Sequence, residues 1–430
     1  MNRRKELWKN LIPAIISNLS IFLLSAVDGV IIGQGAGMHA LGAVNIAAPF
    51  VYFADACFTI ACTGGAAVAA VNIGRNSDEA AQTTFSHSLK ISLVAGLIVT
   101  LSGLLFSEPL SVLLGADETF LSDTKTYIFW YAVFSLPTAL SVCCQAFLRL
   151  DEAQPLVAVT NVVGTVLNII LDILMVFVFK KGVFGAVIAT GISEIVMFLI
   201  PVSHFVLKKG KLRLINKKTE SSLIKEICYR GIPDSLIQCG TLILVATMNV
   251  AAIRFIGPVG VDAFAIFSYI ASFALTVFYG AAEGLQPLLG ISYGKNNESN
   301  LSYYFRSGVI FVICGSLLFI LMFIIFSAPL CQLMGANGEI LVYSVNNMWK
   351  FVIGLVFAGV NVMISVFLYS TEATKEALCF NLLKSVILNP AAVLLLPAVF
   401  GPGIVWYTYI IFEAVTVFVG LLIYKKIRKK

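Results

Sequence analysis

Charge is scarce in this chain. Only 12% of its 430 residues are charged and 59% are hydrophobic, whereas about a quarter of the residues in an ordinary soluble protein are charged. The mean hydropathy is +0.93. The apolar stretches run to 20 residues or more, while the strands of a membrane barrel would span about ten residues and alternate in polarity. The sequence therefore predicts an all-α integral membrane protein.

Cysteine and histidine are too few or too scattered to suggest a chemical site. The nine cysteines show neither a CxxC spacing nor a paired framework, and the three histidines lie far apart. The cysteines are interpreted as small packing residues. An intramembrane enzyme would need a nucleophile–base pair or a metal-ligand set such as HExxH, and the chain has neither. We expect a protein that is not an enzyme and has no cofactor.

Apolar windows predict twelve membrane spans, and the basic residues orient them. When the connections alternate between the two sides, 24 of the 29 lysines and arginines fall on the side of the termini. The positive-inside rule then places both termini in the cytoplasm. On this interpretation "KKGKLRLINKK" is a topology signal in a cytoplasmic linker, not a nucleic-acid site. The spans are roughly 11–33, 41–71, 84–106, 127–149, 156–179, 182–207, 230–256, 261–291, 302–327, 342–369, 376–399 and 402–424.

An internal repeat appears when the chain is shifted by 220 residues. "SEPLSVLLGADETF" at 107–120 then matches "SAPLCQLMGANGEI" at 327–340, and Gly64 falls on Gly284. Six spans per half is an even number, so the halves are predicted to be parallel repeats related by an axis along the membrane normal. We expect two six-helix bundles around a central cavity. They comprise residues 1–207 and 230–430, with a linker at 208–229.

Two carboxylates break the repeat. Asp28 and Asp172 have no acidic counterpart in the second half. Packing requirements are shared by both halves, so charge found in only one half suggests a function performed only there. An ionisable residue within a span is costly unless it is compensated. The 160–179 segment carries Asp172 on the same helical face as Asn161, Thr165 and Asn168.

Depth in the membrane brings the same residues together. At about 1.5 Å per residue, Asp28, Asp172 and Thr190 lie at one level in the outer half of the membrane, and Tyr127 lies near it. Alone, Asn168 suggests an interhelical hydrogen bond and Thr190 a bond to its own helix. As a set, these residues could bind a small cation or share protons.

The motifs around these residues resemble those of the multidrug and toxic compound extrusion (MATE) family, over the whole chain. "VDGVIIGQGAGMHALGAVNIAAP" is similar to the family's opening signature, with Pro13 fifteen residues before the acid. "NIILD" followed by Thr190 resembles the cation site of the DNA-damage-inducible-type branch. "GLQPLLGISYGKNN" in the eighth span is a further family-like segment.

The resemblance implies roles for particular residues. Asp28, Asn168, Asp172 and Thr190 would bind the coupling H⁺ or Na⁺, and would be the metal ligands if the ion is Na⁺. Tyr127, Gln145 and Asn161 would support this network, and Pro13 would kink the first helix. Candidate substrate contacts are Asp55, for which pairing within the bundle is the alternative, Glu283 and Gln286. Glu194 and Glu413 are near repeat equivalents, which favours structural roles for both. The seventh span lacks the glutamate found in some members, so no second cation site is expected there.

The resemblance also implies the function. We expect a cation-coupled antiporter that exports organic cations by alternating access, a monomer in the prokaryotic plasma membrane with lipid as its other partner. The alternative is a lipid-linked oligosaccharide flippase of the same superfamily. A flippase would need several basic residues inside the spans to bind pyrophosphate, and few are present. A channel is disfavoured by the duplication of a bundle within one chain.

Overall fold

Helices make up almost all of the chain. The computed structural model describes residues 3–215, 217 and 220–427, apart from the side chains of Met38, Gln238, Cys239 and Leu242, and this part of the chain contains no strand. In lipid the backbone polar groups must bond internally, which a helix achieves within one segment. The predicted all-α membrane fold is confirmed. Lys218 and residues 428–430, counted above as cytoplasmic basic positions, lie outside the described residues.

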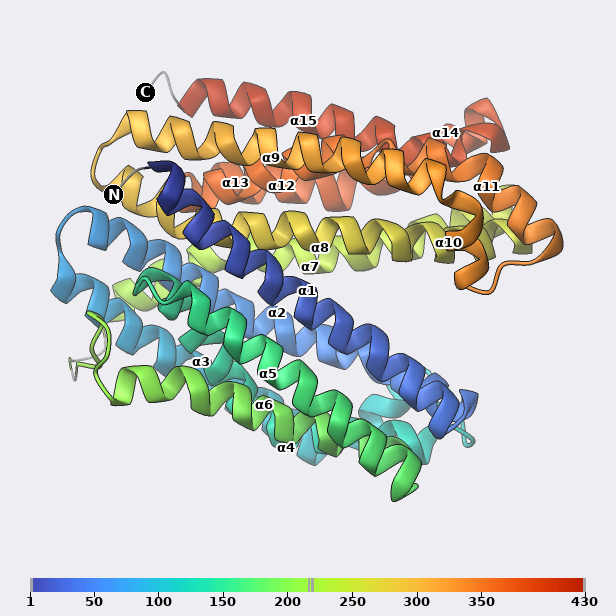
Figure 1. Cartoon of the computed structure of the whole chain (residues 1–430), viewed down its shortest axis with the longest axis horizontal. Helices are drawn as coiled ribbons and strands as arrows, with labels where there is room; N and C mark the ends of the chain where they lie inside the picture. The colour runs from blue at the N-terminus through green and yellow to red at the C-terminus, as the bar shows by residue number, and fades with distance from the viewer. Residues whose placement is uncertain (1–2, 216, 218–219, 428–430) are drawn as a thin grey trace. The chain divides into compact units, whose positions relative to one another are not determined.

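The first half contains six long helices. Figure 1 shows α1 to α6, in blue to green, as helices that run side by side. The bounds are α1 Arg3–Gly35, α2 Met38–Gly74, α3 Asp78–Leu113, α4 Leu121–Leu150, α5 Gln154–Asp172 with the π-helix η1 Ile173–Val178, and α6 Gly182–Val206.

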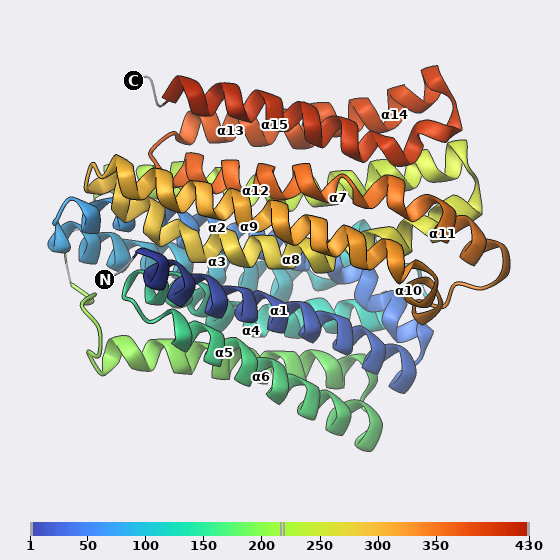
Figure 2. The ribbon, with the colours of Figure 1, turned by 45° about the horizontal axis from the view of Figure 1, so that its top comes forward.

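The second half repeats this order with more interruptions. Figure 2 shows α13 and α14 lying beside α15. The bounds are α7 Ser221–Phe255, α8 Pro258–Gly294, α9 Glu298–Ile325, α10 Ser327–Leu333, α11 Gly338–Val352, α12 Leu355–Ser370, α13 Thr374–Leu382, the π-helix η2 Leu383–Leu388, α14 Asn389–Phe400, the 3₁₀-helix η3 Pro402–Tyr407, and α15 Thr408–Ile427.

The predicted spans correspond closely to these helices. In the described part of the chain, eleven helical segments are long and apolar enough to cross a membrane. The twelfth predicted span, 230–256, falls in α7, of which only Ile243–Phe255 stands out as a shorter apolar helix. Helix α7 begins at Ser221, inside the predicted linker. The short helix α10 was not predicted, because it lies in a connection that reads as a loop.

Backbone turns repeat with the same 220-residue period. The left-handed conformation occurs at Asn76 and Asn296, with φ of 58° and 52°, and at Glu152 and Glu372, both with φ of 60°. Gly115 and Gly335 match in the same way, with φ of 100° and 89°. Positive φ is rare for residues other than glycine. Its recurrence at paired positions shows that the two halves use the same connections.

The chain divides into two compact units, Met1–Ser235 and Leu236–Lys430. In the first unit, α4 packs against α2, α3 and α6, and α1 packs against α5. In the second unit, α12 packs against α8, α9 and α15. The start of α7 belongs to the first unit. It lies so close to α2 that a Cβ on Gly64 would come within 2.0 Å of the Ile227 carbonyl oxygen.

The segment after α6 is held on the first unit by buried side chains. Asp151 Oδ1 accepts hydrogen bonds from the backbone N–H groups of Lys211 at 2.7 Å and Leu212 at 3.1 Å. Asp151 Oδ2 lies 2.9 Å from His204 Nε2. Further along, Ser86 Oγ accepts from the Ile215 N–H at 3.0 Å. The predicted linker therefore begins as a segment attached to the bundle.

Replacing Asp151 with alanine should release this segment. Hydrogen bonds to a charged group contribute about 1.5–3 kcal/mol each, so we expect the Lys211 and Leu212 amides to exchange with deuterium at least about tenfold faster. Hydrogen–deuterium exchange with mass spectrometry measures this. Lys211→Ala is the control, because it removes a side chain that is 86% exposed and keeps the backbone donor. Equal exchange in both variants would contradict the proposed anchoring.

Candidate functional site

The four predicted cation ligands lie on three helices of the first unit. Asp28 lies in α1, Asn168 and Asp172 in α5, and Thr190 in α6. Asp172 is the last residue of α5 before the backbone changes to the π-helix η1. Such π segments are rare and often occur at functional sites. Nothing in the sequence pattern indicated this change of helix type at the carboxylate.

Several oxygens at this site are buried without a donor. Asp172 and Asn168 are both 0% exposed. Both oxygens of Asp172, Oδ1 of Asp28 and Oδ1 of Asn168 accept no hydrogen bond from any residue that the structure describes. Leaving a buried acceptor unsatisfied costs roughly 1–3 kcal/mol, and more when it is charged. Four such oxygens together could accept a proton or coordinate a cation.

The hydroxyl of Thr190 completes the oxygen set. The side-chain amide of Asn168 donates to Thr190 Oγ1 at 3.3 Å, and that hydroxyl donates to the Ala186 carbonyl at 3.1 Å. Both bonds suggested by the sequence for these two residues are therefore present. Asp172 also lies close enough to Asp28 and Asn168 for their side chains to interact.

No basic residue that the structure describes neutralises this acidic pair. Among the described residues, the ion pairs of the first unit involve other acids, and neither Asp28 nor Asp172 takes part in one. The unit's interior therefore holds two adjacent carboxylates without a fixed counter-ion. Carboxylate, amide and hydroxyl oxygens are the ligands that hard cations prefer. No group of three or more His, Cys, Asp and Glu side chains in the described chain could hold a metal ion.

Tyr127 of α4 interacts electrostatically with the carboxylates. It is 8% exposed on α4 and lies within electrostatic range of Asp28, Asp172 and Asp55. Its ring stacks on that of Tyr131, with the centroids 6.4 Å apart. Tyr127 therefore interacts with the acidic pair and also with Asp55 of α2 and Tyr131 of α4.

Gln145 and Asn161 have other contacts. Gln145 donates to Ser141 Oγ at 3.1 Å, and Ser141 donates to the Met197 carbonyl at 2.8 Å, which joins α4 to α6. Gln145 lies 18 residues along α4 from Tyr127, about 27 Å at the rise of an α-helix. Asn161 donates to Ser17 Oγ, which links α5 to α1. Asn161 therefore connects two helices directly, and Gln145 does so only through Ser141.

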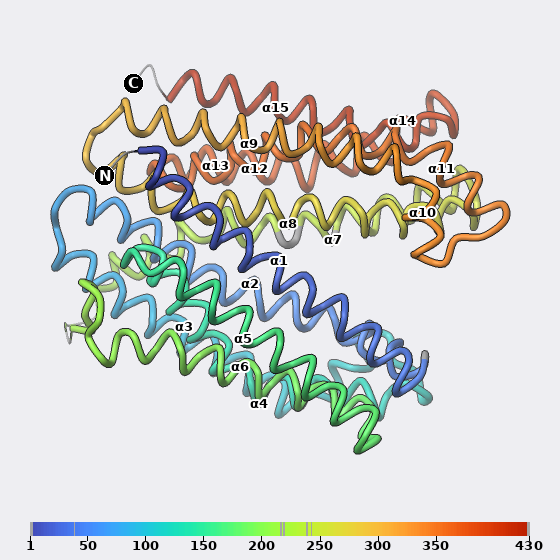
Figure 3. Tube along the Cα trace, in the orientation of Figure 1, coloured from blue at the N-terminus to red at the C-terminus, as the bar shows by residue number. Residues whose placement is uncertain are grey.

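The predicted kink residue lies inside an unbroken helix. Helix α1 continues from Arg3 to Gly35 with Pro13 in its interior, and the trace in Figure 3 runs through it without a gap. Further along α1, a Cβ on Gly29 would have no atom within 4 Å. Helix α1 therefore combines a missing backbone donor at Pro13 with free space at Gly29.

The candidate substrate contacts fall in both units. Asp55 is half-buried on α2 of the first unit. Glu283 is half-buried on α8 of the second unit, and Gln286, one turn further along, is 7% exposed. In the described chain, the Gln286 Nε2 atom donates no hydrogen bond.

Glu194 has a different setting in the structure from the one that the sequence predicts. Glu194 of α6 lies within electrostatic range of Asp55, and its side chain interacts with that of Thr138. The approximate repeat symmetry of Glu194 with Glu413 favours a structural role for Glu194. The spacing offered another signal, since Thr190 and Glu194 are four residues apart and share one helix face. The first unit thus holds two pairs of acids, Asp28 with Asp172 and Asp55 with Glu194.

Comparison with known proteins identifies the family. A family model described as MatE matches the chain twice, at residues 13–174 and 233–394. The two matches begin and end 220 residues apart, which confirms the repeat predicted from the sequence. Together they cover well over half of the chain. The chain belongs to the MatE family. The predicted membrane transporter that is not an enzyme is thereby confirmed.

Relatives in the MatE family match along the whole length. Multidrug export protein MepA of Staphylococcus aureus (strain NCTC 8325 / PS 47) is 24% identical over 433 residues, covering 97% of this chain and 93% of MepA. The MepA protein of Staphylococcus haemolyticus (strain JCSC1435) is 23% identical over 432 residues, covering 97% of this chain and 92% of that protein.

Solved structures share the MatE fold. One is a crystal structure of MATE in complex with MaD3S, with a TM-score of 0.93 and 22% identity. Another is an outward-facing conformation of a multidrug resistance MATE family transporter, also with a TM-score of 0.93 and 22% identity. A third shows MATE in a bent conformation, with a TM-score of 0.91. Each match covers 100% of this chain and 96% of the solved chain. The assignment to the DNA-damage-inducible-type branch stays a prediction.

Proposed function

We propose that this protein is a cation-coupled antiporter that exports organic cations by alternating access, with H⁺ or Na⁺ as the coupling ion. The observation that carries the proposal is the set of four buried oxygens of Asp28, Asn168 and Asp172 that accept no hydrogen bond from the described residues. A bound Na⁺ would be coordinated by these oxygens and by the Thr190 hydroxyl. Protonation of one carboxylate would let it donate to the other.

The coupling requires the acidic pair to differ between the two transport states. A ligand shifts a conformational equilibrium only through its different affinities for the two states. When the cation binds, the repulsion between Asp28 and Asp172 is removed, and α1 can pack more closely against α5. The missing donor at Pro13 and the free space at Gly29 would let α1 bend between the two states.

The proposed substrate class follows from the charge of the first unit. Asp55, Glu194 and Tyr131 form a second polar group with electrostatic interactions among its members. Acids and an aromatic ring provide charge attraction and a cation–π face for an organic cation. The export of multiple drugs, the activity named for the MepA relatives, supports this substrate class for the present chain.

The proposal includes the setting of the protein. We place it in the prokaryotic plasma membrane as a monomer, with both termini in the cytoplasm. The excess of lysine and arginine on that side supports this orientation. Among the described buried residues of the first unit, Arg230 is the only lysine or arginine. An interior with so few basic residues is unsuited to binding a pyrophosphate-linked lipid, which disfavours the flippase alternative.

Transport in proteoliposomes tests the proposal and identifies the ion. Efflux of tetraphenylphosphonium, an organic cation, is followed with a sodium gradient and a proton gradient imposed separately. We expect one gradient to accelerate efflux well above the leak rate and the other to leave it unchanged. Rates equal to those of protein-free liposomes under both gradients would overturn the proposed antiport.

A further inference from the structure

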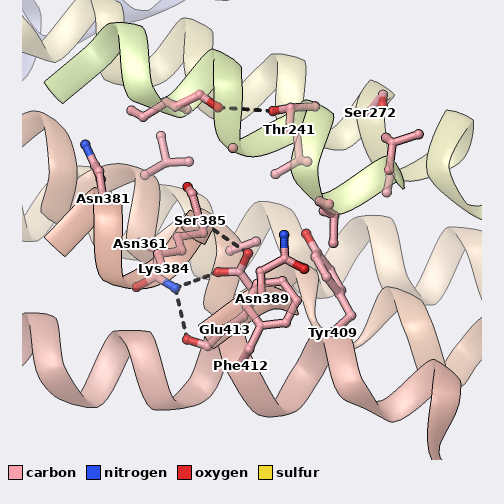
Figure 4. Close-up of a pocket in the computed structure, with 18 of the residues that line it drawn as sticks. Thr241, Ser272, Asn361, Asn381, Lys384, Ser385, Asn389, Tyr409, Phe412 and Glu413 are labelled. Atoms are coloured by element: carbon pink, nitrogen blue, oxygen red, sulfur yellow. Dashed lines mark hydrogen bonds and ion pairs between the residues drawn. The ribbon is translucent and has the colours of Figure 1, made fainter. Parts of the chain in front are cut away.

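The second unit contains a cavity that the proposed cation transport does not use. Residues of α7, α8, α11, α12, α15 and the segment around η2 line it, and its volume is about 100 Å³. Figure 4 shows polar side chains, including Lys384, Asn361 and Glu413, projecting into the same region. This size is comparable to that of an apolar cavity able to hold one aromatic ring.

A partly buried ion pair forms the polar side of this cavity. Lys384 Nζ lies 3.0 Å from Glu413 Oε1. Asn361 Nδ2 donates to Glu413 Oε2 at 2.6 Å and to the Glu413 carbonyl at 2.9 Å. Both carboxylate oxygens of Glu413 therefore have a partner, and this side chain is 3% exposed. A cationic ligand would have to displace Lys384 in order to reach Glu413.

The remaining hydrogen-bonding capacity suits a different ligand. An ammonium group has three N–H donors, and in the described chain Glu413 is the ion-pair partner of Lys384, whose side chain is 23% exposed. Asn361 is 1% exposed, and its Oδ1 accepts no hydrogen bond from the described residues. The cavity thus offers a positive donor beside an unsatisfied acceptor.

Aromatic side chains form the other walls. Phe351 and Tyr409 stack with their ring centroids 4.5 Å apart, Phe264 meets Phe351 edge-on at 6.0 Å, and Phe412 meets Tyr409 at 5.5 Å. All four line the cavity. Such rings favour an aromatic guest through offset or edge-to-face packing.

The internal repeat argues against a purely structural pair. Under the 220-residue shift, Lys384 falls on Gly164, so the first half has no base at that position, whereas Glu413 falls next to Glu194, which lies near another acid. Burying an ion pair costs desolvation that its attraction often fails to recover, and apolar replacements are frequently as stable. A pair present in one half only is therefore better explained by a ligand than by folding.

We propose that this cavity binds a small aromatic carboxylate, with the ligand's carboxylate on Lys384 and its ring among the four aromatic side chains. Glu413 and Asn361 hold the lysine in place, and Asn361 Oδ1 can accept a hydrogen bond from a hydroxyl or amine on the ligand. The proposal goes beyond cation-coupled export, because binding at this site needs no ion gradient and the charge preference is opposite to that of the first unit.

Binding of three matched probes tests the charge preference. The full chain in neutral-lipid nanodiscs is titrated with 4-fluorobenzoate, 4-fluorobenzylammonium and 4-fluorobenzamide by ¹⁹F NMR, with empty nanodiscs subtracted. We expect 4-fluorobenzoate to bind at least about tenfold more tightly than the other two. Equal binding of the three probes, tighter binding of the ammonium, or no binding of the benzoate would overturn the proposal. Efflux under imposed gradients is a separate measurement, so failure of the antiport proposal would leave this result intact.

Two variants locate the site. Lys384→Gln with Glu413→Gln removes both charges together, so no uncompensated acid remains, and benzoate binding should fall at least about tenfold. Ser272→Trp keeps the ion pair and fills the cavity from an exposed lining position, and it should also abolish binding. Lys350→Gln is the control, because this lysine of the same unit pairs with Asn347 outside the cavity. Undiminished binding in the double variant, or in Ser272→Trp if the double variant does not fold, contradicts the assignment.

Discussion

Replacement of Asp172 by asparagine is expected to abolish ion-coupled efflux while folded protein still accumulates in the membrane. Asp172 is fully buried, and neither of its oxygens accepts a hydrogen bond from the described residues. A unit charge 4 Å from a cation contributes about 4 kcal/mol at an effective dielectric constant of 20. Loss of that attraction should slow coupled efflux of tetraphenylphosphonium by about 100-fold or more. The rate is measured in proteoliposomes under the driving gradient.

The matched control is Asp262→Asn. Asp262 is exposed on α8, so its neutralisation changes the net charge of the chain by the same amount without touching the acidic pair. We expect wild-type efflux from this control and equal amounts of both variants in the membrane. An Asp172→Asn protein that still exports at the wild-type rate would remove Asp172 from the coupling mechanism.

Gly64→Leu should strongly destabilise the first unit. A Cβ at this position would lie 2.0 Å from the Ile227 carbonyl oxygen and 2.8 Å from the Gly231 backbone nitrogen. Both atoms belong to the backbone of α7, so no side chain can rotate away. Overpacking typically costs 1–3 kcal/mol, and more where the obstacle is rigid. At about 2–4 °C per kcal/mol for a unit of this size, we expect the melting temperature in detergent to fall by roughly 10 °C.

Gly29→Ala separates packing from the general effect of changing a glycine. No atom lies within 4 Å of a Cβ at this position, and alanine is a better helix former than glycine. We therefore expect an unchanged or slightly higher melting temperature by differential scanning fluorimetry. If Gly64→Leu melts at the same temperature as Gly29→Ala, then α2 and α7 do not cross as closely as the structure shows.

The predicted cation site depended on residues whose spacing could be read directly. Asn168 and Asp172 are one helical turn apart, and the absence of a counterpart to Asp172 in the second half marked it as functional. Thr190 could be placed by its depth, because a helix rises by a constant amount per residue. The donor to Thr190 proved to be Asn168, at 3.3 Å.

Other features could not be predicted because they depend on contacts between helices far apart in the chain. Glu194 lies near Asp55 across 139 positions of sequence, and Lys384 pairs with Glu413 through the packing of η2 against α15. Repeat symmetry suggested that Glu194 and Glu413 were equivalent. The structure instead shows one beside an acid and the other beside a base.

The sequence alone determined that this protein is a helical membrane protein built from a 220-residue repeat, with two unmatched acids in its first half. Hydrophobicity and helical rise act locally along the chain, so length and period are sufficient to predict them. Only the tertiary structure decided which polar atoms find partners. Asp172 is left without a donor while Glu413 receives two, because hydrogen bonds and ion pairs depend on distances between helices that no single segment specifies.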